Sequence, residues 1–294
     1  MKKRRITGED VFIQICILLM IAILLFTMAY PFYHLICYSI SDPSKVRPGF
    51  MLLPKGLNLD AYISLFKKGG LLMAAGVSVA RSICGPILML AVSSMAAYVL
   101  ARRNLIGHKF ISRLFVFTMY ISAGMIPVYR NIYDLHLAHS FWVYVLPGAM
   151  DIFSMVLIRT YIEGIPDGLE EAAHVDGSGY FRTYAQIIMP ICKPILATVA
   201  LFSIVAQWNA YTDTMFYNAS DPNLHPLSYI LMQYMKSSQL SMEAIRVGAG
   251  REQRANAQMV KMAITVITIA PIMCVYPLLQ KYFVKGIMIG AIKG

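Results

Sequence analysis

The sequence predicts an all-α, polytopic membrane protein with six transmembrane helices. Of its 294 residues, 58% are hydrophobic and only 14% are charged, and the mean hydropathy is +0.60. Soluble domains carry about 25% charged residues, so this composition argues against an ordinary soluble fold. Apolar runs of spanning length also recur along the chain between shorter polar segments. The net charge of +11 is dispersed over those segments, which fits membrane topology and lipid headgroups better than binding of nucleic acid.

The first span is predicted at residues 11–40, after a basic head at residues 1–10. Residues 11–41 contain no Asp, Glu, Lys or Arg. This run is longer than the apolar core of a signal peptide, which has about 7–15 residues, so we expect an uncleaved helix with a cytoplasmic N-terminus. Pro31 is expected to bend or end the helix. Residues 42–70 then form the first external loop, with a short amphipathic helix at residues 58–66.

The remaining spans complete one transmembrane domain at residues 11–283. They are predicted at residues 71–101, 114–129, 141–161, 191–212 and 260–281. Ser93, Ser94, Ala96 and Ala97 are small residues that suit close helix contact in the second of the six spans. A tail at residues 284–294 follows. Six spans place both termini on the same side of the membrane, and the basic head indicates that this side is the cytoplasm.

Polar residues inside two of the spans are candidates for a substrate pathway. Asp151 falls in the middle of the fourth span, where a carboxylate costs about 2.5–3.5 kcal/mol on insertion scales. It either lines a pathway or forms hydrogen bonds in helix packing. The fifth span ends in a second group of candidates, namely Gln207, Trp208, Asn209 and Tyr211. Aromatic faces and amide donors suit the C–H faces and hydroxyl edges of sugars, although Trp and Tyr also serve as interfacial anchors.

A polar loop at residues 163–190 separates the fourth and fifth spans. Asp167 is a plausible N-cap, with Glu170 at the capping-box spacing. Gly177 is expected to end this short helix and act as a hinge before a second helix. Local signals alone would fit an ordinary cytoplasmic hairpin.

The order of residues in this loop adds a more specific signal. Six of them follow the spacing E-A-A-x3-G-x9-I-x-L-P: Glu171, Ala172, Ala173, Gly177, Ile187 and Pro190. This resembles the EAA loop of ABC importer permeases, with Met189 in place of the usual Leu. Asp176 and Gly177 also match a D-G pair that is common in the family. The resemblance implies a coupling helix that docks in a cleft of an ATPase. The implied coupling residues are Glu170, Glu171, Ala172, Ala173, Asp176 and Gly177.

The resemblance covers most of the chain. The string W-N-x-Y at residues 208–211 is similar to the fifth span of carbohydrate-importer permeases. The chain is most similar to the smaller permease of the maltose-importer type, in the branch for complex oligosaccharides. That family implies a bacterial plasma-membrane complex with a second homologous permease, two ABC ATPase subunits and an extracytoplasmic solute-binding protein. It also implies a sugar substrate and transport by alternating access.

The sequence lacks the motifs of an enzyme. It contains no P-loop, no ABC signature and no candidate catalytic triad, so we expect ATP and Mg²⁺ to bind the partner ATPase. No Cys or His spacing predicts a metal site, and no cofactor is expected in this chain. Two other classes remain open. One is an ion-coupled secondary transporter using Asp151, although no inverted repeat is visible. The other is a membrane scaffold or sensor subunit. The sequence leaves open which sugar is carried and whether it is acidic.

Overall fold

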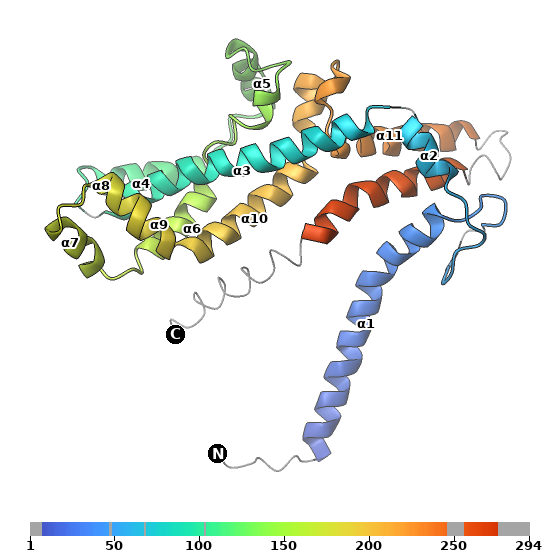
Figure 1. The fold of residues 1–294 in the computed structure, drawn as a ribbon, viewed down its shortest axis with the longest axis horizontal. Helices are drawn as coiled ribbons and strands as arrows, with labels where there is room; N and C mark the ends of the chain where they lie inside the picture. The colour runs from blue at the N-terminus through green and yellow to red at the C-terminus, as the bar shows by residue number, and fades with distance from the viewer. Residues whose placement is uncertain (1–7, 47–48, 68, 103, 246–255, 276–294) are drawn as a thin grey trace. The chain divides into compact units, whose positions relative to one another are not determined.

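The computed structural model describes residues 8–46, 49–67, 69–102, 104–245 and 256–275, which are helical or irregular throughout (Figure 1). No β-strand occurs in those ranges, in agreement with the predicted all-α class. The chain forms two compact units. One comprises residues 1–68 and 234–269, and the other comprises residues 69–233 and 270–294.

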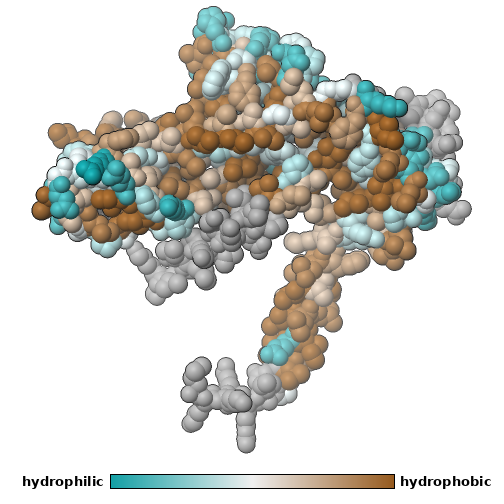
Figure 2. All heavy atoms as spheres, viewed as in Figure 1, coloured by the Kyte–Doolittle hydropathy of each residue, from teal (hydrophilic) through white to brown (hydrophobic). Residues whose placement is uncertain are grey.

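The first unit is dominated by a long apolar helix, α1 (Gly8–Ser39). Large hydrophobic side chains are exposed along most of its length, and its visible face is almost entirely apolar (Figure 2). Such a helix is stable only where lipid or another protein covers it. The unit has a small core formed by Cys37, Tyr38, Val46, Met51 and Met259. The predicted amphipathic helix is confirmed as α2 (Asp60–Lys67).

The second unit is built on α3 (Leu71–Ala101), which packs against both α6 (Ile152–Ile162) and α10 (Lys193–Asn209). The ribbon shows α3 and α10 side by side (Figure 1). Ser93, Ser94 and Ala97 are buried in α3, which confirms the predicted close approach of its neighbours at small residues. Their burial lets the larger side chains of α6 and α10 complete a continuous core around Met155, Ile158 and Val199.

The third and fourth predicted spans differ from the helices in the structure. Residues 114–129 are divided between α4 (His108–Thr118) and α5 (Met125–Asp134). Gly124 stands at the break with φ 83° and ψ 169°, a conformation that a residue with a Cβ rarely adopts. Residues 141–161 begin with a short 3₁₀ turn, η1 (Phe141–Tyr144), and become α-helical only at Ile152. Asp151 is therefore the N-cap of α6 and not a mid-helix residue.

The segment from Tyr180, within the predicted polar loop, to Ile191 bends sharply before α10. It comprises α8 (Tyr180–Thr183), a π-helical turn η2 (Tyr184–Ile188) and α9 (Met189–Ile191). This segment and α10 differ in direction by 80° across Cys192. Pro190 and Pro194 flank the bend, and proline lacks the N–H that a continuous helix requires. After α10 the chain forms η3 (Thr214–Asn218), η4 (Pro222–Leu224) and α11 (Leu227–Ile245).

Three described helices are long and apolar enough to cross a membrane, namely Val11–Ser39, Leu71–Ala101 and Asn256–Val275. A fourth is added if the bent pair Tyr180–Ile191 and Lys193–Asn209 counts as one span. The described part of the chain thus supports a membrane protein with three or four clear spans. The predicted tail at residues 284–294, the end of the predicted sixth span and most of the basic head lie outside the described residues.

Candidate functional site

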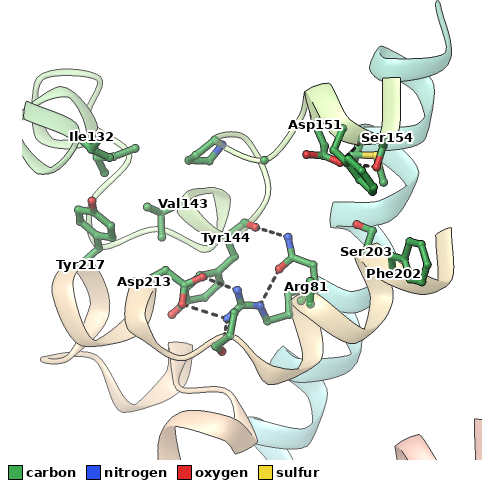
Figure 3. A pocket seen from close by; sticks show the side chains of 18 residues that line it. Arg81, Ile132, Val143, Tyr144, Asp151, Ser154, Phe202, Ser203, Asp213 and Tyr217 are labelled. Atoms are coloured by element: carbon green, nitrogen blue, oxygen red, sulfur yellow. Dashed lines mark hydrogen bonds and ion pairs between the residues drawn. The ribbon is translucent and has the colours of Figure 1, made fainter. Parts of the chain in front are cut away.

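The second unit contains a cavity of about 610 Å³ between α3, α5, α6 and α10 and the segments that follow α5 and α10 (Figure 3). Its wall is mainly apolar and aromatic, with Tyr144, Phe153, Phe202 and Tyr217 among the lining residues. Polar groups are few and lie at defined positions, as in many ligand sites. The aromatic faces could stack on sugar rings, while Ser203 contributes a hydroxyl to the wall.

One end of the cavity is closed by a polar network centred on Arg81, a residue of α3 that is 1% exposed. Its Nε donates to Oε1 of Gln207 at 3.0 Å, and its Nη1 donates to the carbonyl oxygen of Ala210 at 3.1 Å. Both terminal nitrogens also bond to the carboxylate of Asp213, and the guanidinium lies 4.4 Å from the ring centre of Tyr144 (Figure 3). Arg81 therefore connects α3 to the point where α10 ends.

Gln207 completes this network by donating from Nε2 to the carbonyl oxygen of Tyr144 at 3.0 Å. Helix α3 lies close to the Gln207 side chain at residue 85, and there is room for that side chain because residue 85 is glycine. A Cβ on Gly85 would lie 2.7 Å from Nε2 of Gln207. Both amide atoms of Gln207 are thus engaged inside the protein.

Asp151 lies at the opposite side of the cavity from this network (Figure 3). Its carboxylate accepts hydrogen bonds from the backbone N–H of Ser154 at 2.9 Å and from the Ser154 hydroxyl. Its backbone N–H donates to Oγ of Ser93 on α3 at 3.2 Å. These bonds give the carboxylate a structural role as a helix cap, and the residue still lines the cavity.

The other predicted pathway residues separate into different environments. Trp208 is 7% exposed and belongs to the packed interior. Asn209 is exposed and donates to the carbonyl oxygen of Val205 at 2.9 Å. Tyr211 is 39% exposed. The structure brings Asp151 and Gln207 to the cavity but places Trp208, Asn209 and Tyr211 outside its lining.

The second candidate site is the predicted coupling segment, which forms α7 (Gly168–Val175). Asp167 is its N-cap, but its side chain makes no capping bond. Gly177 has φ +76° and ends the helix with two hydrogen bonds. Its own N–H donates to the carbonyl of His174 at 3.0 Å, and that of Ser178 donates to the carbonyl of Ala173 at 2.9 Å. This is a Schellman motif, which favours glycine at this position.

Most of the predicted coupling residues are accessible. Glu171, Ala172 and Asp176 are exposed, Ala173 packs inward at 6% exposure, and Glu170 is partly buried. In the space-filling view, hydrophilic residues gather at the end of the unit where α7 lies (Figure 2). An exposed acidic helix with a small-residue face and a fixed glycine turn is suited to docking on another protein.

The sequence pattern identified Glu170 but not Arg81, Asp213 or Arg102 as residues of the two sites. Arg81 and Asp213 lie 132 positions apart, and Arg102 and Glu170 lie 68 apart. A charged residue in an apolar span requires a partner, so Arg81 carried a usable signal. That signal does not identify which of the carboxylates is the partner.

Comparison with known protein families identifies the family of this chain. Residues 93–289 match the family described as binding-protein-dependent transport system inner membrane component. The chain belongs to this family. It is therefore a membrane permease of an ABC importer, and ATP hydrolysis takes place in a separate subunit of such systems.

Individual relatives cover nearly the whole permease. It is 34% identical over 266 residues to the polygalacturonan/rhamnogalacturonan transport system permease protein YtcP of Bacillus subtilis (strain 168), covering 90% of this chain and 92% of the relative. It is 27% identical to the arabinooligosaccharides transport system permease protein AraQ of Halalkalibacterium halodurans, with 93% and 94% covered. A crystal structure of a bacterial ABC transporter for import of the acidic polysaccharide alginate contains a similar chain. It has 26% identity and a TM-score of 0.82, and the match covers 96% of the permease and all of that chain.

Proposed function

We propose that the permease moves an oligosaccharide containing uronic acid units across the bacterial plasma membrane by alternating access. Support comes from the relative named for transport of polygalacturonan and rhamnogalacturonan and from the structural neighbour in an importer of alginate. The transport mechanism in this proposal depends on one observation, the exposed helix α7 with its glycine turn. A separate ATPase could bind α7 and, by moving it, displace the transmembrane helices.

In this proposal the chain has six spans with both termini in the cytoplasm. It pairs with a second homologous permease, two ATPase subunits that bind ATP and Mg²⁺, and an extracytoplasmic solute-binding protein. Glu170, Glu171, Ala172, Ala173, Asp176 and Gly177 form the contact with the ATPase. Closure of the ATPase pair displaces α7, and the central cavity changes its access from the cytoplasm to the outside.

The charges that line the cavity suggest that the two permeases contact different parts of the sugar. Among the described residues that line it, Arg81 is the one cation, and its charge is compensated by Asp213. Asp151 adds a further negative charge. We therefore assign to this permease the aromatic contacts with the sugar rings, and to the partner permease the cations that meet the uronate groups.

Asp151 gives little support to an ion-coupled secondary transporter. Its carboxylate is already bonded to the N–H and the hydroxyl of Ser154, so capping of α6 accounts for its presence.

The proposal is tested with the complete complex in proteoliposomes that contain ATP, with the binding protein outside. We expect uptake of labelled oligogalacturonide that depends on ATP and persists when ionophores collapse ion gradients. A neutral arabino-oligosaccharide serves as the comparison substrate. ATP-driven uptake of the neutral sugar alone would contradict the uronate assignment. Uptake that needs a gradient and is lost in Asp151→Asn would contradict the importer mechanism.

A further inference from the structure

Arg102 is one of the side chains through which the C-terminal end of α3 contacts α7 and α8. This residue is the C-cap of α3. Its guanidinium carbon lies 4.7 Å from the ring centre of Tyr98, one turn earlier on α3, and 4.1 Å from the ring centre of Tyr180 in α8. The planar cation is thus placed between an aromatic ring of each element, a geometry that arginine adopts and lysine reproduces poorly.

The same guanidinium is ion-paired with α7. Its Nη2 lies 2.9 Å from Oε2 of Glu170, in the first turn of the helix, and also donates to the hydroxyl of Tyr98. Both charged side chains are about one-quarter exposed, at 25% and 26%. Arg102 therefore contacts α3, α7 and α8 at once.

The contact continues along α3 through a second aromatic residue. The ring centres of Tyr98 and Tyr184 are 5.4 Å apart, and the hydroxyl of Tyr184 is hydrogen-bonded to that of Ser94 at 2.8 Å. Ser94, Tyr98 and Arg102 lie on successive turns of one face of α3. Residues of α7, α8 and η2 thus contact α3 over about two helical turns.

These side-chain contacts matter because α7 is joined to α6 and α10 by short stretches of backbone, whereas no short stretch of backbone joins it to α3. The chain passes from α6 into α7 and from α9 into α10. Arg102, at the end of α3, lies 68 residues before Glu170 in the sequence. Helix α3 nevertheless contributes Arg81 and Met89 to the cavity wall. If α3 is to move with the other two helices, side-chain contacts must transmit the displacement.

We propose that Arg102 is the positioning residue that transmits displacement of α7 to α3, through its ion pair with Glu170 and its stacking on Tyr98 and Tyr180. The inference rests on the proposed function of α7 as the ATPase-coupling helix. It extends that function to a helix that the coupling loop does not reach through the backbone.

The proposal predicts loss of coupling without loss of assembly. Solvent screens an ion pair that is one-quarter exposed, so its removal should leave folding and insertion largely intact. In proteoliposomes, Arg102→Gln is expected to retain ATPase activity. The amount of sugar imported per ATP should fall by about 5-fold or more, which is the smallest effect that typical coupling free energies produce. Arg102→Lys should give an intermediate ratio because it keeps the charge and loses the stacked plane.

Two further variants separate transmission from other roles. The exchange Arg102→Glu with Glu170→Arg should recover part of the lost ratio, since it restores the ion pair. The control is Glu163→Gln, which removes a carboxylate paired with Arg159 at 2.8 Å within one helical segment. This control should keep the wild-type ratio.

The outcomes discriminate between this inference and the function on which it rests. Absence of ATP-driven uptake by the wild-type complex would overturn the proposed function itself. Normal coupling in Arg102→Gln, while wild type is active, would overturn only the role of Arg102. Loss of coupling in Glu170→Gln but not in Arg102→Gln would also overturn it, because Glu170 would then act directly on the ATPase. Failure of the ATPase to copurify with Arg102→Gln would indicate a docking role in its place.

Discussion

Replacing Asp213 with asparagine is expected to destabilise the permease by about 3 kcal/mol, the lower part of the range for breaking a buried ion pair. The substitution keeps the shape of the side chain and an acceptor for the N–H of Thr214, which now bonds to Oδ1 at 2.7 Å. It leaves the guanidinium of Arg81, at 1% exposure, with the neutral acceptors Gln207 and Ala210. An uncompensated buried cation is the main cost.

The measurement is the temperature at which half of the detergent-solubilised complex unfolds. The double variant Arg81→Met with Asp213→Asn should unfold at a higher temperature than Asp213→Asn alone, because it buries no charge. Asp134→Asn is the control, since its pair with Arg130 is highly exposed, at 57% and 78%, and should contribute little. A double variant that is less stable than the single one would refute this account of the network.

Replacing Gly177 with valine is expected to uncouple ATP hydrolysis from transport. At φ +76° a β-branched residue is strained by about 1–2 kcal/mol, and relief of that strain would break the two hydrogen bonds that end α7. No atom lies within 4 Å of the added Cβ, so the effect arises from the backbone and not from a clash. Sugar imported per ATP should fall about 5-fold or more while ATPase activity persists.

Two nearby positions provide controls for this result. Gly177→Asn should retain most of the coupling because asparagine tolerates the left-handed region. Gly179→Val should also retain it, since Gly179 has φ −73° and its added Cβ likewise meets nothing within 4 Å. Import at the wild-type rate by a correctly inserted Gly177→Val would show that the glycine turn has no part in coupling.

The sequence predicted those features that depend on local pattern. The helix at α7 and its end at Gly177 follow from propensity and from the conformational freedom of glycine, and the structure contains both. The long helices α1 and α3 follow from long, predominantly apolar runs. The predicted fourth span is shorter as a helix because residues 145–149 form turns and bends around Pro147 and Gly148 before α6 begins.

The cavity could not be predicted in the same way, because it depends on contacts between distant residues. The sequence at residues 207–211 suggested four pathway side chains, Gln207 among them, but a helix turns its successive residues to different sides. Of these four side chains, Gln207 alone lines the cavity, and Trp208 packs in the interior. The partners of Arg81 and Arg102 became visible only when α3 was placed against α10 and α7.

We expect α7 to lie on the cytoplasmic side in contact with a separate ATPase. The position of α7 can be tested with Val175→Cys, at the exposed last residue of the helix, in a background without the five native cysteines. Leu57→Cys, in the loop predicted to be external, is the control for labelling from outside, since Leu57 is 83% exposed. We predict that a thiol cross-linker joins residue 175 to the ATPase and that an impermeant thiol reagent outside intact cells labels residue 57 but not residue 175. Labelling of residue 175 from outside, or no cross-link to the ATPase in the purified complex, would contradict the account.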